Sequence, residues 1–143
     1  MNVLFVCTGN TCRSPMAQAI LQKIAEEKGW DMQCDSAGLF AHEGAGVSDG
    51  ARTVLAECFG VDSFSHAAKP VTREIAAWAD AVIGVTEDHR RYFVQLFGGA
   101  EKAFSLPVGV GDPFGGGRAE YEEAARAIRA GIEELIARGI LHG

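Results

Sequence analysis

Short apolar runs alternate with longer segments of helical periodicity along this chain. Residues 2–7 (NVLFVC) form a continuous apolar run after Asn2, rich in β-branched and aromatic side chains, which is typical of a strand buried on both faces. The other predicted strands are residues 32–38, 80–86 and 102–106. Because predicted helices separate these strands, the pattern indicates a parallel sheet with helices on both faces.

Helical spacing is clearest near the end of the chain, where the apolar positions form one stripe made of Tyr121, Ala124, Ala125, Ile128, Ile132, Leu135 and Ile136. A first helix is predicted with Ser14 as its N-cap, Pro15 as its first helical residue and Gly29 at its end. Further helices are predicted over residues 51–60, 71–79 and, starting at Thr86, through Phe97. Residues 40–51 are rich in glycine and predict a loop.

The chain has 143 residues, the usual size of one domain. We find no repeat, low-complexity segment or linker, so we expect a single α/β domain over residues 1–143, with a four-stranded parallel sheet flanked by helices on both faces.

Charge and hydropathy argue against several functional classes. The net charge is −6 and no run of Lys or Arg is present, so nucleic acid is a poor candidate partner. No apolar run is as long as a membrane span, and the N-terminus lacks the features of a secretory signal. We therefore expect a cytoplasmic protein without nucleic-acid or membrane binding, and nothing in the sequence demands an obligate oligomer.

The four cysteines are Cys7, Cys12, Cys34 and Cys58. A disulfide framework is not expected in a chain of this size without a secretion signal. Neither the cysteines nor the four histidines show the paired short spacings of a zinc site, so we set zinc aside. We expect no metal and no organic cofactor, because a thiolate and Arg13 can do the work that a metal would otherwise do.

The stretch VCTGNTCRSP (residues 6–15) joins the first strand to the first helix. Backbone N–H groups of such a loop can all point inward beside the positive end of the helix dipole, which makes an anion site. Gly9 permits backbone angles that other residues resist, and Asn10 tolerates a left-handed conformation. Arg13 offers a planar fork for two phosphate oxygens, and Ser14 offers a hydroxyl.

Cys7 lies at the floor of this predicted cup, where the groups that bind phosphate also stabilise a thiolate. Because the thiolate would face a bound phosphorus, we expect it to attack the phosphorus and form a phosphocysteine intermediate. Asp112, in the loop GDPFGGG (residues 111–117), is the predicted donor of a proton to the leaving group, and Pro113 stiffens the backbone behind it. Both loops follow strands, so they are expected to meet at the carboxyl edge of the sheet.

Plainer interpretations exist for each residue. A free Cys such as Cys7 is more often a buried packing residue, and an Asp-Pro followed by glycines is by default a turn. The other phosphate loop, GxxxxGK[ST], is absent. The strand, glycine, arginine, Ser-Pro pair and distant Asp-Pro loop agree with one another, and this agreement favours cysteine-based phosphate chemistry.

VCTGNTCRSPMA closely resembles the phosphate loop of the low-molecular-weight protein tyrosine phosphatase family, and DSAG, FSHAAKPVT, ADAVIGVT and DPFGG follow in that family's order. The resemblance implies phosphorylated proteins as substrates, Cys7 as nucleophile, Arg13 as clamp on the transition state and Asp112 as general acid and base. It also implies a phosphate-binding loop made of Thr8, Gly9, Asn10, Thr11, Cys12, Arg13 and Ser14.

The same resemblance implies supporting residues. Ser36 is expected to hydrogen-bond Asn10, Ser14 to stabilise the thiolate, and His66 to support the loop, although a lone His is more often structural. Cys12 matches a cysteine that can form a reversible, protective disulfide with the nucleophile, or it is a small packing residue. Cys34 and Cys58 are interpreted as core residues.

Thr11 departs from the pattern of most tyrosine phosphatases of this family, which carry a larger aliphatic residue there. GNTCRS, DPFGG and VTEDHR resemble the protein arginine phosphatase branch, so Thr11 and Phe114 are the predicted specificity residues, with Phe114 as a loop anchor the alternative. A tyrosine phosphatase is the nearest rival. An arsenate reductase would need further cysteines in residues 78–95, which hold none, and an inactive phosphate-binding module would be expected to have lost Cys7, Arg13 or Asp112.

Overall fold

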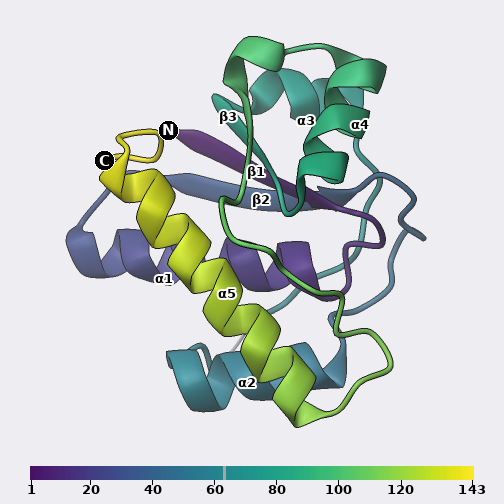
Figure 1. Ribbon diagram of the computed structural model, residues 1–143, viewed down its shortest axis with the longest axis vertical. Coiled ribbons are helices and arrows are strands. Elements are labelled where there is room, and N and C mark those ends of the chain that lie inside the picture. The colour runs from purple at the N-terminus through teal and green to yellow at the C-terminus, as the bar shows by residue number, and fades with distance from the viewer. Residues whose placement is uncertain (63) are drawn as a thin grey trace.

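A computed structural model describes residues 1–62 and 64–143 and shows a four-stranded sheet with helices on both sides (Figure 1). The strands are β1 (Asn2–Cys7), β2 (Gln33–Gly38), β3 (Ala81–Gly84) and β4 (Ala103–Ser105). Their order in the sheet is β2-β1-β3-β4, and every neighbouring pair is parallel. The predicted α/β class and parallel four-stranded sheet are therefore confirmed.

The helices are α1 (Arg13–Lys28), α2 (Asp49–Phe59), α3 (Arg73–Trp78), α4 (Glu87–Phe97) and α5 (Arg118–Ala137), with a short 3-10 turn over Ala100–Lys102. Helices α1, α2 and α5 cover one face of the sheet, and α3 and α4 cover the other (Figure 1).

Burial on both faces explains why β1 is a continuous apolar run. Val3, Phe5 and Cys7 pack into the core formed with α1, α2 and α5. Leu4 and Val6, which alternate with them, pack into the second core under α3 and α4. The strand therefore needs apolar side chains at successive positions.

The end of α1 and the start of α4 agree with the sequence prediction. Gly29 ends α1 in the left-handed conformation, and Thr86 caps α4 by accepting a hydrogen bond from the His89 backbone N–H. The predicted start of α1 was wrong, because the helix begins at Arg13 with Cys12 in the cap position. Ser14 lies inside the first turn, where its hydroxyl contacts Cys7 and Asn10 rather than capping the helix.

The other boundaries moved by a few residues. Helix α2 begins at Asp49, inside the segment predicted as a loop, and α3 starts at Arg73 after Thr72 has capped it. No helix among the described residues is both long and apolar enough to pass through a bilayer.

Strand β1 lies between β2 and β3 in the sheet. After β1 the chain continues to β2 on one side of it, and after β2 it continues to β3 on the other side. In open α/β sheets a crevice forms outside the carboxyl ends of the strands at such a switch point. Gly38, at the end of β2, lets the β1–α1 loop sit close, because a Cβ at this position would lie 2.6 Å from the Thr8 carbonyl oxygen. A side chain there would push the loop away from the sheet.

Candidate active site

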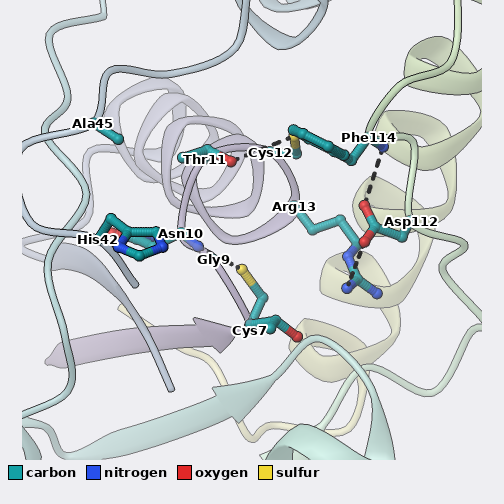
Figure 2. A pocket seen from close by; sticks show the side chains of 11 residues that line it. Cys7, Gly9, Asn10, Thr11, Cys12, Arg13, His42, Ala45, Asp112 and Phe114 are labelled. Atoms are coloured by element: carbon teal, nitrogen blue, oxygen red, sulfur yellow. Dashed lines mark hydrogen bonds and ion pairs between the residues drawn. The ribbon is translucent and has the colours of Figure 1, made fainter. Parts of the chain in front are cut away.

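A cavity of about 320 Å³ opens at this edge of the sheet (Figure 2). The residues that line it are Cys7, Thr8, Gly9, Asn10, Thr11, Cys12, Arg13, His42, Ala45, Asp112 and Phe114. The loop of residues 6–15 and the loop of residues 111–117 therefore meet at this edge, as predicted. Arg13 Nη2 lies 3.6 Å from Asp112 Oδ2.

The loop between β1 and α1 turns at Asn10, which has a φ of 58° and is the one non-glycine residue with positive φ in residues 1–62 and 64–143. Asparagine adopts this conformation more readily than most residues. The expected left-handed conformation of Asn10 is therefore confirmed, whereas Gly9 does not use its wider conformational freedom, because its φ is not positive and a Cβ there would meet only Thr11 Oγ1, at 3.9 Å.

Hydrogen bonds fix the orientation of the Asn10 amide. Its Oδ1 accepts from the backbone N–H of Lys69 at 3.1 Å, so its Nδ2 must face the opposite way. That nitrogen donates to Ser14 Oγ at 2.8 Å and to Ser36 Oγ at 3.0 Å. Ser36 in turn donates to Gln18 Oε1 at 2.7 Å. The hydrogen bond expected between Asn10 and Ser36 is present.

This network also places the Ser14 hydroxyl beside Cys7. Ser14 Oγ accepts from Asn10 and lies 2.9 Å from Cys7 Sγ, within hydrogen-bond distance of the sulfur. The backbone N–H of Asn10 donates to the same sulfur at 3.3 Å. The sulfur is therefore contacted by one backbone N–H and one hydroxyl, and the stabilisation of a Cys7 thiolate by Ser14 stays a prediction.

His66 supports the loop from outside. Its Nε2 lies 2.7 Å from the Asn10 carbonyl oxygen, which can only accept, so Nε2 carries the proton. Burial lowers the pKa of His66, and the hydrogen bond to Asn10 partly opposes this effect. The predicted contact is present, and its importance for activity stays a prediction.

Arg13 and Asp112 differ in exposure. Arg13 is 9% exposed, and its Nη1 donates to the Val110 carbonyl oxygen at 3.4 Å, which holds the guanidinium against the wall of the cavity. The Asp112 side chain is 56% exposed. Its Oδ1 accepts from the backbone N–H of Phe114 at 3.1 Å, and Pro113 between them is buried. The carboxylate is thus held by the loop but reaches the solvent side of the cavity.

Two side chains form the mouth of the cavity. Thr11 is half-buried and lines it, and Phe114 is 76% exposed at the rim (Figure 2). The alternative that Phe114 anchors the loop is wrong, because so exposed a ring is not packed into the protein. His42 and Ala45, which sequence reasoning missed, line the wall from the segment after β2.

The four cysteines are all free. Cys12 Sγ contacts Ser48 Oγ at 3.4 Å and the Tyr121 hydroxyl at 3.6 Å, so a disulfide with Cys7 stays a prediction. Cys34 and Cys58 are half-buried and pack against the core, as predicted, and burial raises the pKa of Cys34 to about 12. Within the described parts of the chain, no group of three His, Cys, Asp or Glu side chains could hold a metal ion.

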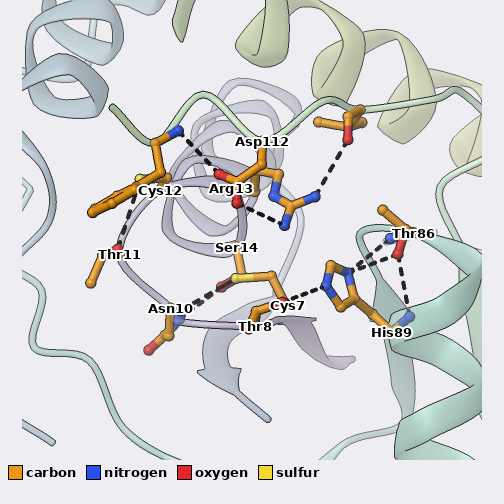
Figure 3. Close-up of polar contacts among 12 residues, drawn as sticks. Cys7, Thr8, Asn10, Thr11, Cys12, Arg13, Ser14, Thr86, His89 and Asp112 are labelled. Atoms are coloured by element: carbon orange, nitrogen blue, oxygen red, sulfur yellow. Dashed lines mark hydrogen bonds and ion pairs between the residues drawn. The ribbon is translucent and has the colours of Figure 1, made fainter. Parts of the chain in front are cut away.

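His89, which sequence reasoning missed, joins α4 to the phosphate-binding loop (Figure 3). Its Nδ1 lies 3.2 Å from the backbone nitrogen of Thr86, and its Nε2 lies 3.0 Å from Thr8 Oγ1. The only signal in the sequence was its position three residues after the helix cap Thr86. A polar side chain at that position can bond back to the N-cap backbone.

His89 is neutral near pH 7. Burial lowers its pKa to about 4, assisted by the positive charge of Arg13 and opposed by Asp88 and Asp112. Because this pKa lies below the unfolded value of about 6.5, the unfolded chain binds a proton first as the pH falls. The stability held by neutral His89 is therefore complete above pH 6.5 and is lost as the pH falls toward 4.

We expect His89→Gln to flatten the pH dependence of stability. The free energy of unfolding of the wild type should fall by about 2 kcal/mol more than that of the variant between pH 7.5 and pH 5. Urea denaturation at both pH values measures this, with matching circular dichroism spectra at pH 7.5 as the control. An equal fall in the free energy of unfolding of the two proteins between pH 7.5 and pH 5 would contradict the assignment of this pH dependence to His89.

Known proteins are similar to this chain in sequence and in fold. Residues 2–139 match the family model described as low molecular weight phosphotyrosine protein phosphatase. A protein-arginine-phosphatase of Bacillus subtilis (strain 168) is 36% identical, over 95% of this chain and 92% of the relative.

Two solved structures are also similar. A low molecular weight protein tyrosine phosphatase from T. tengcongensis superposes with a TM-score of 0.90 and 37% identity, over 96% of this chain and 99% of the other. A structure of the YwlE arginine phosphatase, in a mutant whose active-site serine is phosphorylated, superposes with a TM-score of 0.89 and 33% identity, over 96% of this chain and 95% of the other. The chain therefore belongs to the low-molecular-weight phosphotyrosine protein phosphatase family and is a protein phosphatase.

Proposed function

We propose that this phosphatase hydrolyses phosphoarginine in proteins through a phosphocysteine at Cys7. The observation that carries the proposal is the shape of the cavity mouth, where the small, polar Thr11 and the exposed carboxylate of Asp112 stand beside the buried Arg13. A guanidinium leaving group is planar and rich in N–H donors, so the carboxyl group at the mouth can accept its hydrogen bonds and, when protonated, can give a proton to the leaving nitrogen.

The first chemical step breaks the P–N bond. Phosphate oxygens occupy the loop of residues 8–14 and the fork of Arg13, while Cys7 Sγ attacks the phosphorus. Asp112, as the acid, gives its proton to the leaving nitrogen, so the arginine side chain departs and phosphocysteine forms. Asp112 pairs with Arg13 at 3.6 Å, and we infer that bound phosphate replaces this contact and frees the carboxyl group.

The second step restores the enzyme. Asp112, now a carboxylate, takes a proton from a water molecule whose oxygen attacks the phosphorus. The S–P bond breaks, inorganic phosphate leaves, and Cys7 returns as a thiolate that Ser14 and the Asn10 N–H stabilise. A phosphorylated serine in the active site of the YwlE mutant supports attack from this position.

Phosphotyrosine is the second candidate substrate, because the T. tengcongensis relative is named a tyrosine phosphatase and is as similar as the arginine phosphatases. The chemistry would be the same, and only the wall of the cavity would differ. We also propose a cytoplasmic location, since a free catalytic thiol needs a reducing compartment.

Thr11→Ile tests the substrate proposal. The added methyl group and the loss of the hydroxyl should narrow the mouth and favour a flat aromatic ring, so the ratio of kcat/KM for phosphoarginine to that for phosphotyrosine should fall about tenfold or more. The ratio is measured on one peptide scaffold that carries either residue.

Thr53→Ile is the matched control, because Thr53 is exposed on α2 outside this cavity. This variant should keep the ratio of the wild type. A Thr11→Ile enzyme with an unchanged ratio would remove Thr11 from the account of specificity.

A further inference from the structure

The contacts of His89 determine which of its nitrogens carries the proton. The backbone N–H of Thr86 can only donate, and it points at Nδ1 from 3.2 Å, so Nδ1 accepts. The Thr86 hydroxyl, 3.0 Å from the same nitrogen, can donate to it as well. In a neutral ring the proton is then on Nε2.

The proton on Nε2 in turn orients Thr8. Nε2–H donates to Thr8 Oγ1 over 3.0 Å, so the hydrogen of the Thr8 hydroxyl must point elsewhere. Thr8 lines the cavity and follows Cys7 directly, and its backbone is pinned because its carbonyl oxygen accepts from the N–H of Phe40 at 2.9 Å. Figure 3 shows the Thr8 side chain between Cys7 and the imidazole.

We propose that His89 is a positioning residue, which holds the Thr8 hydroxyl as a hydrogen-bond donor to the phosphoryl group in the cavity. The chain of bonds runs from Thr86 through His89 to Thr8, and so from the start of α4 to the loop after β1. The inference rests on the proposed phosphatase site, but it holds whether the phosphoryl group arrives on arginine or on tyrosine.

The electrostatic surroundings suit this role. Arg13 lies close enough to His89 to disfavour a charged ring, and a charged ring would place an N–H on Nδ1 facing the Thr86 N–H. Asp88 and Asp112 are the acidic groups near the ring. The neutral ring keeps one tautomer and therefore one orientation of Thr8.

A double-mutant cycle tests the inference, with 4-nitrophenyl phosphate as the substrate. Thr8→Val removes the hydroxyl and should lower kcat/KM about tenfold, while Thr8→Ser keeps it and should restore most of the rate. His89→Gln keeps a side chain that can bond back to the Thr86 N–H but loses the contact to Thr8, and should cost about fivefold. The double variant Thr8→Val/His89→Gln should lose about tenfold, not the fiftyfold product.

The inhibition constant of vanadate is a second measurement, and a merely structural role of His89 would not change it. Vanadate copies the five-coordinate phosphorus of the transition state, so its inhibition constant should rise in proportion to the loss of kcat/KM in both single variants. Thr53→Val on the exposed face of α2 makes the same chemical change outside this cavity and should leave both quantities at wild-type values.

Three results would overturn the inference. The first is multiplicative loss in the double variant, and the second is Thr8→Val with wild-type activity. The third is a lowered melting temperature of His89→Gln with unchanged kcat/KM, which would assign His89 to packing alone. Because 4-nitrophenyl phosphate carries neither arginine nor tyrosine, failure of the phosphoarginine proposal would leave this test intact.

Discussion

Replacing Cys7 with serine is expected to stop steady-state turnover, with a loss of about 10⁴-fold or more in kcat. The Asn10 N–H donates to the sulfur and the Ser14 hydroxyl lies within hydrogen-bond distance of it, which places Cys7 where the proposed mechanism needs a nucleophile. A serine hydroxyl is not ionised at neutral pH, and any phosphoserine that forms is a stable ester without the weak S–P bond. Phosphate release from a phosphoarginine peptide measures the loss.

Cys58→Ser is the matched control, because Cys58 is half-buried near the end of α2 and does not line the cavity. This variant should turn over at the rate of the wild type. Cys7→Ala should be as inactive as Cys7→Ser in the steady state but should never accept a phosphoryl group, which mass spectrometry can detect. A Cys7→Ser enzyme that turned over near the wild-type rate would end the cysteine mechanism.

Replacing Asp112 with asparagine is expected to lower kcat/KM for a phosphoarginine peptide by about 10²- to 10⁴-fold. The amide cannot protonate the leaving nitrogen or take the proton from water. Asp112 is exposed at the cavity mouth, so the change should leave the fold intact. The loss should be smaller for 4-nitrophenyl phosphate, whose leaving group departs as an anion without a proton.

Comparing kcat/KM for the two substrates in Asp112→Asn and wild type tests the acid role, because kcat/KM does not include the hydrolysis of the phosphocysteine that both substrates share. Asp49→Asn provides the control, since Asp49 is an exposed carboxylate in the first turn of α2. Equal losses on both substrates would show that Asp112 acts through binding or loop structure rather than as the acid.

The strongest sequence signals were those with a local physical cause. The apolar run of β1 follows from its burial between two cores, and the left-handed Gly29 ends α1. The loop between β1 and α1 was predictable because Asn10, Arg13 and Cys7 can form an anion site only where a strand leads into the N-terminus of a helix. The meeting of this loop with Asp112 followed from the parallel order of the strands.

Features that depend on contacts distant in the sequence could not be predicted in this way. His89 lies 81 residues from Thr8, and only the order β1-β3 in the sheet brings the two together. The cap of α1 was misplaced because Ser14 is a good N-cap by local preference, yet Asn10 and Cys7 compete for its hydroxyl. The exposure of Phe114 likewise depends on how its loop folds over Asp112.

Competition between two substrates tests the central claim most directly. Equal amounts of one peptide carrying phosphoarginine or phosphotyrosine are mixed with the enzyme, and mass spectrometry follows both until half of the faster one is gone. The relative rates give the ratio of the two kcat/KM values, with Cys7→Ala as the blank. We predict that phosphoarginine disappears at least tenfold faster. Faster loss of phosphotyrosine would leave Cys7 as nucleophile but contradict the assignment of Thr11 and Asp112 to phosphoarginine.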